Sequence, residues 1–274
     1  STEGSFRIRG LQAVGRVAVG MELTTFTDRL DDELDTEAYA EVDASANGLQ
    51  VGPPEADLEH AAFAVDAAEA TIESAADAGA DVLVTHHGLS WGGIERVTGR
   101  QYGRIAPLVR NDLALYVSHL PLDGHQELGN AAGIADLLGL AGTAPFGSMG
   151  PVTVGQQGRL AEPTDVDETA RRLEADLEGT ESVQRLAVGP ETVETVAIVT
   201  GSGSDWLDEA VDVGADLLIT GEGKQQVYHR AREAGINVLL AGHYATETVG
   251  VRNLQALADD WGLSTSYHAH PTGL

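Results

Sequence analysis

The stretch ADAGADVLVTHH occupies residues 76–87, and a closely similar stretch, VDVGADLLITGE, occupies residues 211–222. Gly79 of the first stretch aligns with Gly214 of the second. A glycine that ends a helix, followed by a short branched apolar run, is typical of a helix that leads into a buried strand. Because this helix–strand pattern occurs twice, the sequence predicts a duplicated unit.

The repeat extends on both sides of these stretches. Upstream, HAAFAVDAAEATIESA at 60–75 matches ETVAIVTGSGSDWLDEA at 194–210, which has one extra residue. Downstream, LALYVSHLPLD at 113–123 matches INVLLAGHYATE at 236–247. Strands separated by helices favour parallel pairing with right-handed crossovers. We therefore predict an α/β fold in which two similar duplicated units surround a central cleft.

The chain divides into three segments in this interpretation. Residues 1–20 carry three arginines and a single acid, so we expect a leader or upstream extension, with a genuine first strand as the alternative. Residues 21–145 form the first unit and 146–274 the second, with a boundary in the Gly- and Pro-rich segment 142–151. The terminal segment STSYHA, 264–269, can pair with either sheet.

Composition limits the classes of protein. The chain has 274 residues and 42% apolar residues, without a run long enough to span a membrane or a secretory signal pattern. We therefore expect a cytoplasmic protein with a buried core. Cysteine is absent, so any metal site must use imidazole and carboxylate ligands, which suit Zn, Fe, Mn, Co or Ni.

The charge is strongly acidic, with 43 acidic and 16 basic residues and a formal net charge of −27. Such a chain repels nucleic acid, so nucleic-acid binding is not expected. One interpretation is an ordinary acidic protein. We favour a halophilic protein from a high-salt cytoplasm, where concentrated cations screen the carboxylates.

Histidines and acids follow the predicted strands in both repeats. His86 and His87 end one strand, and His119 and Asp123 follow the next. The second repeat has HYATE at 243–247, where a helix would place its first and last residues on one face. Pro121 is expected to keep HLPLD from forming a regular helix. Any one of these pairs could be structural, but together they predict a site for two divalent cations.

These motifs carry a family resemblance. VTHHGLSW, SHLPLDGHQELGN, ITGE and AGHYATE resemble the Nif-three-like dinuclear metal-centre proteins, often labelled GTP cyclohydrolase I type 2 homologues. The likeness covers about residues 21–274. It implies a two-domain α/β fold and a ring-shaped homohexamer whose sites face an internal cavity. One departure is Tyr244, where the family commonly has histidine.

The resemblance also implies the ligands. His87 and Asp123 would hold one metal ion, His86 and His243 would hold the other, and Glu247 would bridge the two. All five positions carry the expected residue type.

Other residues near these motifs allow alternatives. His119 is either a sixth ligand or, as we favour, a residue that orients Asp123. Glu222 is either a catalytic base that activates water or a helix N-terminal acid.

His125 and Asn130 are candidates for substrate binding, and the Gly-Ser turn at 201–204 for phosphate binding. Trp91 could stack on a planar ring, although packing in the core is favoured.

Two functions remain open from the sequence. A metal-dependent hydrolase would act on a small-molecule substrate such as a nucleotide or phosphoester. The alternative is a non-catalytic protein for metal storage, delivery or scaffolding. A complete P-loop or dinucleotide fingerprint, which would identify a substrate, is not found in the sequence.

Overall fold

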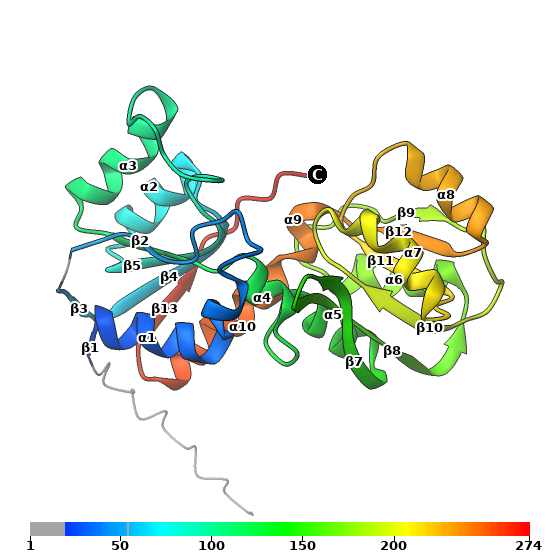
Figure 1. Cartoon of the computed structure of the whole chain (residues 1–274). Helices are drawn as coiled ribbons and strands as arrows, with labels where there is room; N and C mark the ends of the chain where they lie inside the picture. Colours follow the sequence, from blue (N-terminus) through cyan, green and yellow to red (C-terminus); the bar gives the residue numbers. More distant parts are fainter. Residues whose placement is uncertain (1–19, 54) are drawn as a thin grey trace, which may run out of the picture.

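The computed structural model describes residues 20–53 and 55–274. Two α/β units lie side by side, and α4, α5 and α10 lie between them (Figure 1). The prediction for residues 1–20 falls, apart from Gly20, outside the described residues. Among the described helices, none has the length and apolar content that a membrane crossing requires.

The first unit is built on a five-stranded sheet with the order β13-β4-β5-β6-β2. Three of its four neighbouring strand pairs are parallel. The fourth pair is antiparallel, because β2 runs opposite to β6. A separate short pair, β1 and β3, lies beside it. The elements of this unit are β1 (Met21–Glu22), α1 (Leu23–Leu34), η1 (Thr36–Tyr39), β2 (Gly48–Val51), β3 (Asp57–Leu58), β4 (His60–Asp66), α2 (Glu69–Asp77), β5 (Val82–His87), α3 (Arg100–Arg110), β6 (Ala114–Val117) and β13 (Ser264–Tyr267).

Successive side chains along the strands point to opposite faces of this sheet, so both faces are packed. Phe63 and Val84 point into a core that also contains residues of α1 and α10. Their neighbours Ala64 and Leu83 point to the opposite face, into a core shared with α2 and α3. Because both faces are covered by helices, the central strands are continuously apolar, as expected for a parallel sheet.

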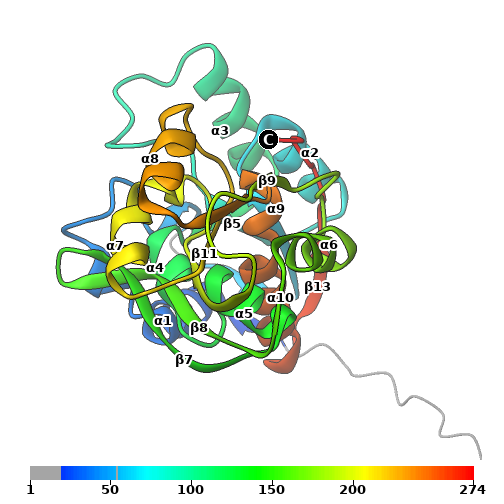
Figure 2. The same cartoon turned by 90° about the vertical axis from the view of Figure 1, so that its right-hand side faces the viewer.

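The second unit is built on a six-stranded sheet with the order β7-β8-β10-β11-β12-β9. Its helices α5 and α6 lie on one side of the sheet, and α7 and α8 lie on the other (Figure 2). The elements from β6 onward are α4 (Leu120–Gly124), α5 (Asn130–Leu138), β7 (Leu140–Met149), β8 (Val152–Thr164), α6 (Val166–Asp176), β9 (Gln184–Leu186), β10 (Val193–Ile198), η2 (Gly203–Trp206), α7 (Leu207–Asp212), β11 (Leu217–Thr220), α8 (Gln226–Ala234), β12 (Asn237–Leu240), α9 (His243–Thr246) and α10 (Thr248–Asp260).

The predicted duplication is confirmed by the topology. The parallel strands β4-β5-β6 correspond to β10-β11-β12 in the same order. The aspartate of each Gly-Ala-Asp turn also makes the same contacts. Asp81 accepts hydrogen bonds from the backbone of Glu59 and His60, and Asp216 accepts them from Glu194 and Thr195. The repeated turn thus fixes the start of the neighbouring strand in both units.

The Gly- and Pro-rich segment at the predicted boundary is largely a strand. Most of segment 142–151 belongs to β7, which pairs with β8 in a long antiparallel hairpin. The pairing is irregular between Ala141 and Ala144, where Gly142 has a φ of 61°. Gly142 therefore allows a bend within the strand, because glycine adopts positive φ without a steric cost.

The end of the described chain returns to the first unit. α10 packs beneath β4, and β13 then pairs with β4 in parallel, with Ser264 opposite His60. The segment STSYHA therefore joins the first sheet. As a result, the first sheet contains strands from both ends of the described chain (Figure 1).

Candidate metal centre

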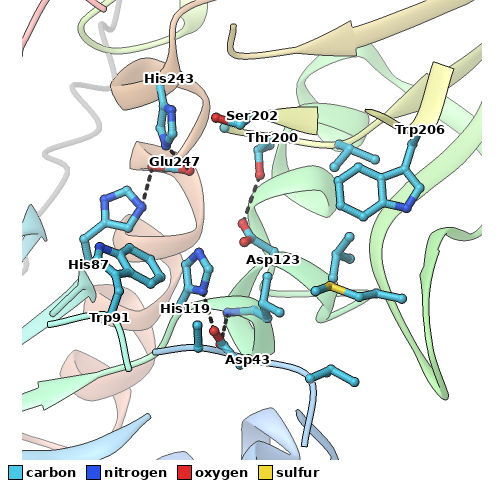
Figure 3. A pocket seen from close by; sticks show the side chains of 17 residues that line it. Asp43, His87, Trp91, His119, Asp123, Thr200, Ser202, Trp206, His243 and Glu247 are labelled. Carbon is cyan, nitrogen blue, oxygen red and sulfur yellow. Dashed lines mark hydrogen bonds and ion pairs between the residues drawn. The ribbon is translucent and has the colours of Figure 1, made fainter. Parts of the chain in front are cut away.

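The five predicted ligands come together where the two units meet. Figure 3 shows four of them, His87, Asp123, His243 and Glu247. His86 and His87 lie at the carboxyl end of β5, and Asp123 lies on α4, which follows β6. His243 begins α9, and Glu247 ends it. Carboxyl ends of parallel strands are the usual place for ligands in open α/β sheets.

The HLPLD segment forms a short helix, α4, contrary to the expectation from its proline. Pro121 lies in the first turn, where a missing backbone N–H costs nothing and the fixed φ suits a helix. The helix places Asp123 toward the site, almost completely buried at 8% exposure.

Two groups of ligand atoms converge on Glu247. In the first, the Nε2 atom of His86 lies 3.6 Å from Oδ1 of Asp123 and 3.5 Å from Oε1 of Glu247. In the second, Nε2 of His87 lies 3.5 Å from Oε2 of Glu247, and Nε2 of His243 lies 3.1 Å from Oε1. This grouping differs from the pairing implied by the resemblance, because Asp123 accompanies His86, and His243 accompanies His87.

Each imidazole is held by a hydrogen bond at Nδ1, which leaves Nε2 for the centre. Metal-ligating histidines typically have such a partner, because it fixes the ring and its tautomer. The four Nδ1 partners are the carbonyl of Ser118 for His86 at 2.9 Å, Asp66 for His87 at 2.8 Å, Asp43 for His119 at 2.9 Å and Glu222 for His243 at 3.0 Å.

His119 therefore does not orient Asp123 as expected. The imidazole ring of His119 is hydrogen-bonded to the carboxylate of Asp43. The carboxylate of Asp123 instead accepts hydrogen bonds from Asn130 and Thr200, both at 2.9 Å. His119 also forms a ligand-like group with His86 and His87, so its role as a sixth ligand stays open.

The other candidates take different positions. Glu222 accepts hydrogen bonds from Ser202 at 2.5 Å and from His243, so its contacts favour positioning of His243; its predicted catalytic role stays a prediction. Asn130 is fully buried behind Asp123 rather than lining the cavity. His125 lies outside the cavity, because its ring contacts the backbone of Glu33 and of its own turn.

Three supporting residues were missed by the sequence interpretation. Asp66 ends β4, and Thr200 lies two residues beyond the end of the equivalent strand β10, so their positions near strand ends could have indicated them. Asp43 lies in a loop after η1 and has no such signal. Burial alone would raise the pKa of Asp43, but the hydrogen bond and charge of His119 lower it to about 2. Asp43 is therefore an anionic anchor for His119.

The centre contains buried polar atoms that lack a partner. The Nε2 atom of His86 and the Oε2 atom of Glu247 are buried without a hydrogen bond to any described residue. A buried polar group without a partner costs about 1–3 kcal/mol. Both atoms point toward the space shared by the other ligands, so the residues present fit a group that accepts nitrogen and oxygen donors, such as a divalent cation.

The buried carboxylates raise the pKa values of two of these imidazoles, those of His86 and His243. Burial alone would lower the pKa of His86, but the charges of Asp123 and Glu247 raise it to about 10. The hydrogen bond to Glu247 raises the pKa of His243 to about 9. Burial would raise the pKa of Glu247, yet His86 and His87 hold it far below its usual range.

The metal-free protein should lose stability as the pH rises toward 10. The folded pKa values of His86 and His243 lie above their ordinary value of 6.5, so the folded state binds more protons than the unfolded chain at neutral pH. Their stabilisation is complete below about pH 6.5 and disappears through pH 9–10. The urea midpoint of chelator-treated protein, measured at constant salt, should fall over this range. A midpoint that rises or stays constant would contradict the expectation, and metal-loaded protein serves as the control.

A cavity of about 380 Å³ opens above the centre. The ligands His87, Asp123, His243 and Glu247 form one side, and Trp206 faces them across the cavity (Figure 3). Trp91 also lines the cavity and remains 56% exposed, so the expectation that it packs in the core is wrong. The site therefore combines a polar side, whose residues could hold a metal ion, with an aromatic side.

Comparisons with known proteins agree with this architecture. The family model described as Duf34/NIF3 (NGG1p interacting factor 3) matches residues 21–267. A protein of Halobacterium salinarum named GTP cyclohydrolase 1 type 2 homolog is 56% identical over 255 residues, covering 93% of this chain and all of that relative. A relative from Archaeoglobus fulgidus with the same name is 41% identical, with the same coverage of both chains.

Solved structures show the same arrangement. The crystal structure of TTHA1606 from Thermus thermophilus matches with a TM-score of 0.84 and 37% identity, covering 93% of this chain and all of that one. The likeness therefore includes both units as well as the segment that joins them.

Proposed function

Because the chain belongs to the Duf34/NIF3 family, we propose that it binds two divalent metal ions per chain and uses them as a hydrolase. The observation that carries this proposal is the convergence of imidazole and carboxylate atoms on Glu247, where Nε2 of His86 and Oε2 of Glu247 are buried without a hydrogen bond. The proposed ligands are His86, His87, Asp123, His243 and Glu247.

The ligand geometry supports a shared carboxylate. Glu247 is 2% exposed and belongs to both ligand groups. Its Oε1 lies near His86 and His243 and its Oε2 lies near His87, which supports a carboxylate shared by two ions. The backbone approaches it closely at Gly201, where a Cβ atom would lie 2.5 Å from Oε1. Gly201, with a φ of 56°, therefore leaves the room that a bridging carboxylate needs.

The donor set suits Zn, Fe, Mn, Co or Ni, because imidazole and carboxylate accept most first-row divalent ions. A pair of such ions supplies Lewis-acid polarisation of a substrate oxygen and a nucleophile from water near neutral pH. The chain contributes the orientation. Asn130 and Thr200 fix Asp123, and Glu222 fixes the ring of His243.

We infer a nucleotide-like or phosphoester substrate from the name that the relatives carry and from the oxygen chemistry of such centres. A screen of metal-loaded protein against nucleotides and phosphoesters tests this. We expect turnover that chelation removes and that Glu247→Gln abolishes. Tight metal uptake without turnover of any substrate would contradict the hydrolase and favour a protein for metal storage, delivery or scaffolding. His229→Ala, an exposed histidine on α8, is the matched control.

We also propose a homohexamer in a high-salt cytoplasm. Large hydrophobic side chains are exposed on and before α3, which supports a subunit contact there. These side chains are Ile94, Val97, Tyr102 and Val109. Light scattering in molar KCl should give the mass of six chains, and a monomer mass would contradict the assembly.

A further inference from the structure

Six apolar side chains line the cavity and are called the apolar wall here: Val42, Leu120, Met149, Val154, Val199 and Trp206. Among them, Trp206 lies across the cavity from the candidate metal ligands (Figure 3). Such a combination, with a few polar groups at one end and apolar side chains at the other, is typical of sites for amphipathic small molecules. The wall is distinct from the ligand set, so it can determine which molecule the centre receives.

The wall is held in place by polar contacts behind it. The indole N–H of Trp206 donates to the carbonyl of Ser148 at 3.0 Å, at the end of β7 next to Met149. The carboxylate of Glu209 accepts hydrogen bonds from the backbone of Gly147 and Ser148. These bonds tie the β7–β8 hairpin to η2 and α7. Because Trp206 is already fixed, a ligand can pack on it with little loss of side-chain entropy.

The cavity lacks groups that would hold a polyphosphate. Among the residues that the structure describes, no arginine or lysine lines it; Arg104 lines a separate hollow beyond His87 and Trp91. The backbone N–H groups of Gly201 and Gly203 are occupied by Thr246 and Thr220. The Gly-Ser turn therefore cannot use these donors for phosphate. A triphosphate would leave charges unpaired beside Asp43.

We propose that the substrate is a phosphoester with one acidic group at the metal end and a compact apolar or aromatic body against Trp206 and Met149, rather than a nucleoside triphosphate. This inference rests on the proposed function, because it places the acidic group on the metal ions. Trp206 then acts as a specificity-determining residue. Its ring would stack on a planar body or cover an aliphatic one.

Binding of two inert phosphonates to metal-loaded protein tests the proposal. Phenylphosphonate and methylphosphonate share the acidic group and differ in the apolar body. By titration calorimetry in molar KCl, phenylphosphonate should bind about tenfold more tightly, as expected for burial of an aromatic ring. GTP should bind no more tightly than methylphosphonate. A phenyl-to-methyl ratio near one, no binding of either phosphonate, or GTP binding tenfold tighter than methylphosphonate would overturn the proposal.

Variants of the wall residues test which side chains cause the preference for phenylphosphonate. Trp206→Ala should reduce the phenyl-to-methyl ratio to about one and leave methylphosphonate binding within about twofold, whereas Trp206→Phe should restore most of the ratio. Met149→Ala should lower the ratio without removing the indole, which keeps the test valid if Trp206→Ala does not fold. Trp261→Ala is the control, because Trp261 packs on Phe26 in the first unit. An unchanged ratio in both wall variants would refute the assignment.

The two proposals fail in different ways. If no ester is hydrolysed but the phenylphosphonate preference and its dependence on Trp206 remain, the hydrolase is wrong and the ligand class stands. If esters are hydrolysed while the ratio is near one, the hydrolase stands and the apolar wall does not select the substrate.

Discussion

Replacement of Glu247 by alanine should reduce bound metal from about two ions per chain to almost none, because one bridging carboxylate serves both ions. Both ligand groups include Glu247, and each would retain only two of its members. The loss should exceed that of any single histidine variant. Elemental analysis after loading and exhaustive dialysis measures the effect, and full occupancy in Glu247→Ala would exclude the bridging role.

Single-ligand variants provide the comparison for Glu247→Ala. His86→Ala and His243→Ala belong to different groups, so each should lose mainly one ion. His119→Ala should keep both ions but bind them about 10–100-fold less tightly if His119 only supports the centre. If His119→Ala instead loses an ion at saturating metal, His119 is a sixth ligand. His229→Ala should bind as the unaltered protein does.

Transfer from molar KCl to dilute buffer should destabilise the fold strongly. The formal charge of −27 is screened over only about 3 Å at 1 M salt, but over about 30 Å at 0.01 M. Mutual repulsion of the carboxylates should then cost several kcal/mol, which corresponds to a melting temperature lower by on the order of 10 °C.

The melting temperature should be measured by calorimetry across a KCl series at constant pH and metal content. Light scattering at each concentration separates unfolding of the chain from dissociation of an assembly, because dissociation lowers the mass before the heat-absorbing transition. Equal stability in dilute buffer and in molar KCl would identify an ordinary acidic protein instead.

The duplicated α/β framework was predictable because its signals are local. Helix-ending glycines and apolar strands recur in register, and the matching contacts of Asp81 and Asp216 show that the same sequence makes the same turn twice. The strand that covers most of residues 142–151 was not predictable in the same way. A glycine such as Gly142 is as typical of a loop as of a bent strand. Only the pairing of this segment with β8 distinguishes the two structures.

The positions at strand ends predict which candidate ligands lie together, but they do not predict how these residues divide into two groups. Whether Asp123 lies near His86 or near His87 depends on the orientation of the imidazole rings. The hydrogen bond at Nδ1 fixes that orientation, and for His86 the acceptor is a backbone carbonyl. Asp43 was missed because a loop aspartate has many uses. Only its hydrogen bonds to His119 and to the backbone of Leu120 reveal its position.

Asymmetry between the repeats also has a steric origin. Gly221 occupies the position equivalent to His86, and a Cβ atom there would lie 2.7 Å from both the carbonyl oxygen of Gly201 and Cα of His243. A second histidine pair therefore has no room in the second unit. The duplication yields one shared centre, to which the second unit contributes its helix α9.

The position of β13 sets an order of events during synthesis. The first sheet needs residues 264–267 at its edge, and α10 covers one of its faces. Strands β4 to β6 leave the ribosome early, yet their partners follow only after the whole second unit has been translated. Domains that are complete in sequence fold as they emerge. Here every strand of the second unit is translated before β13, so we expect the first sheet, with the candidate ligands on β5, to be completed last.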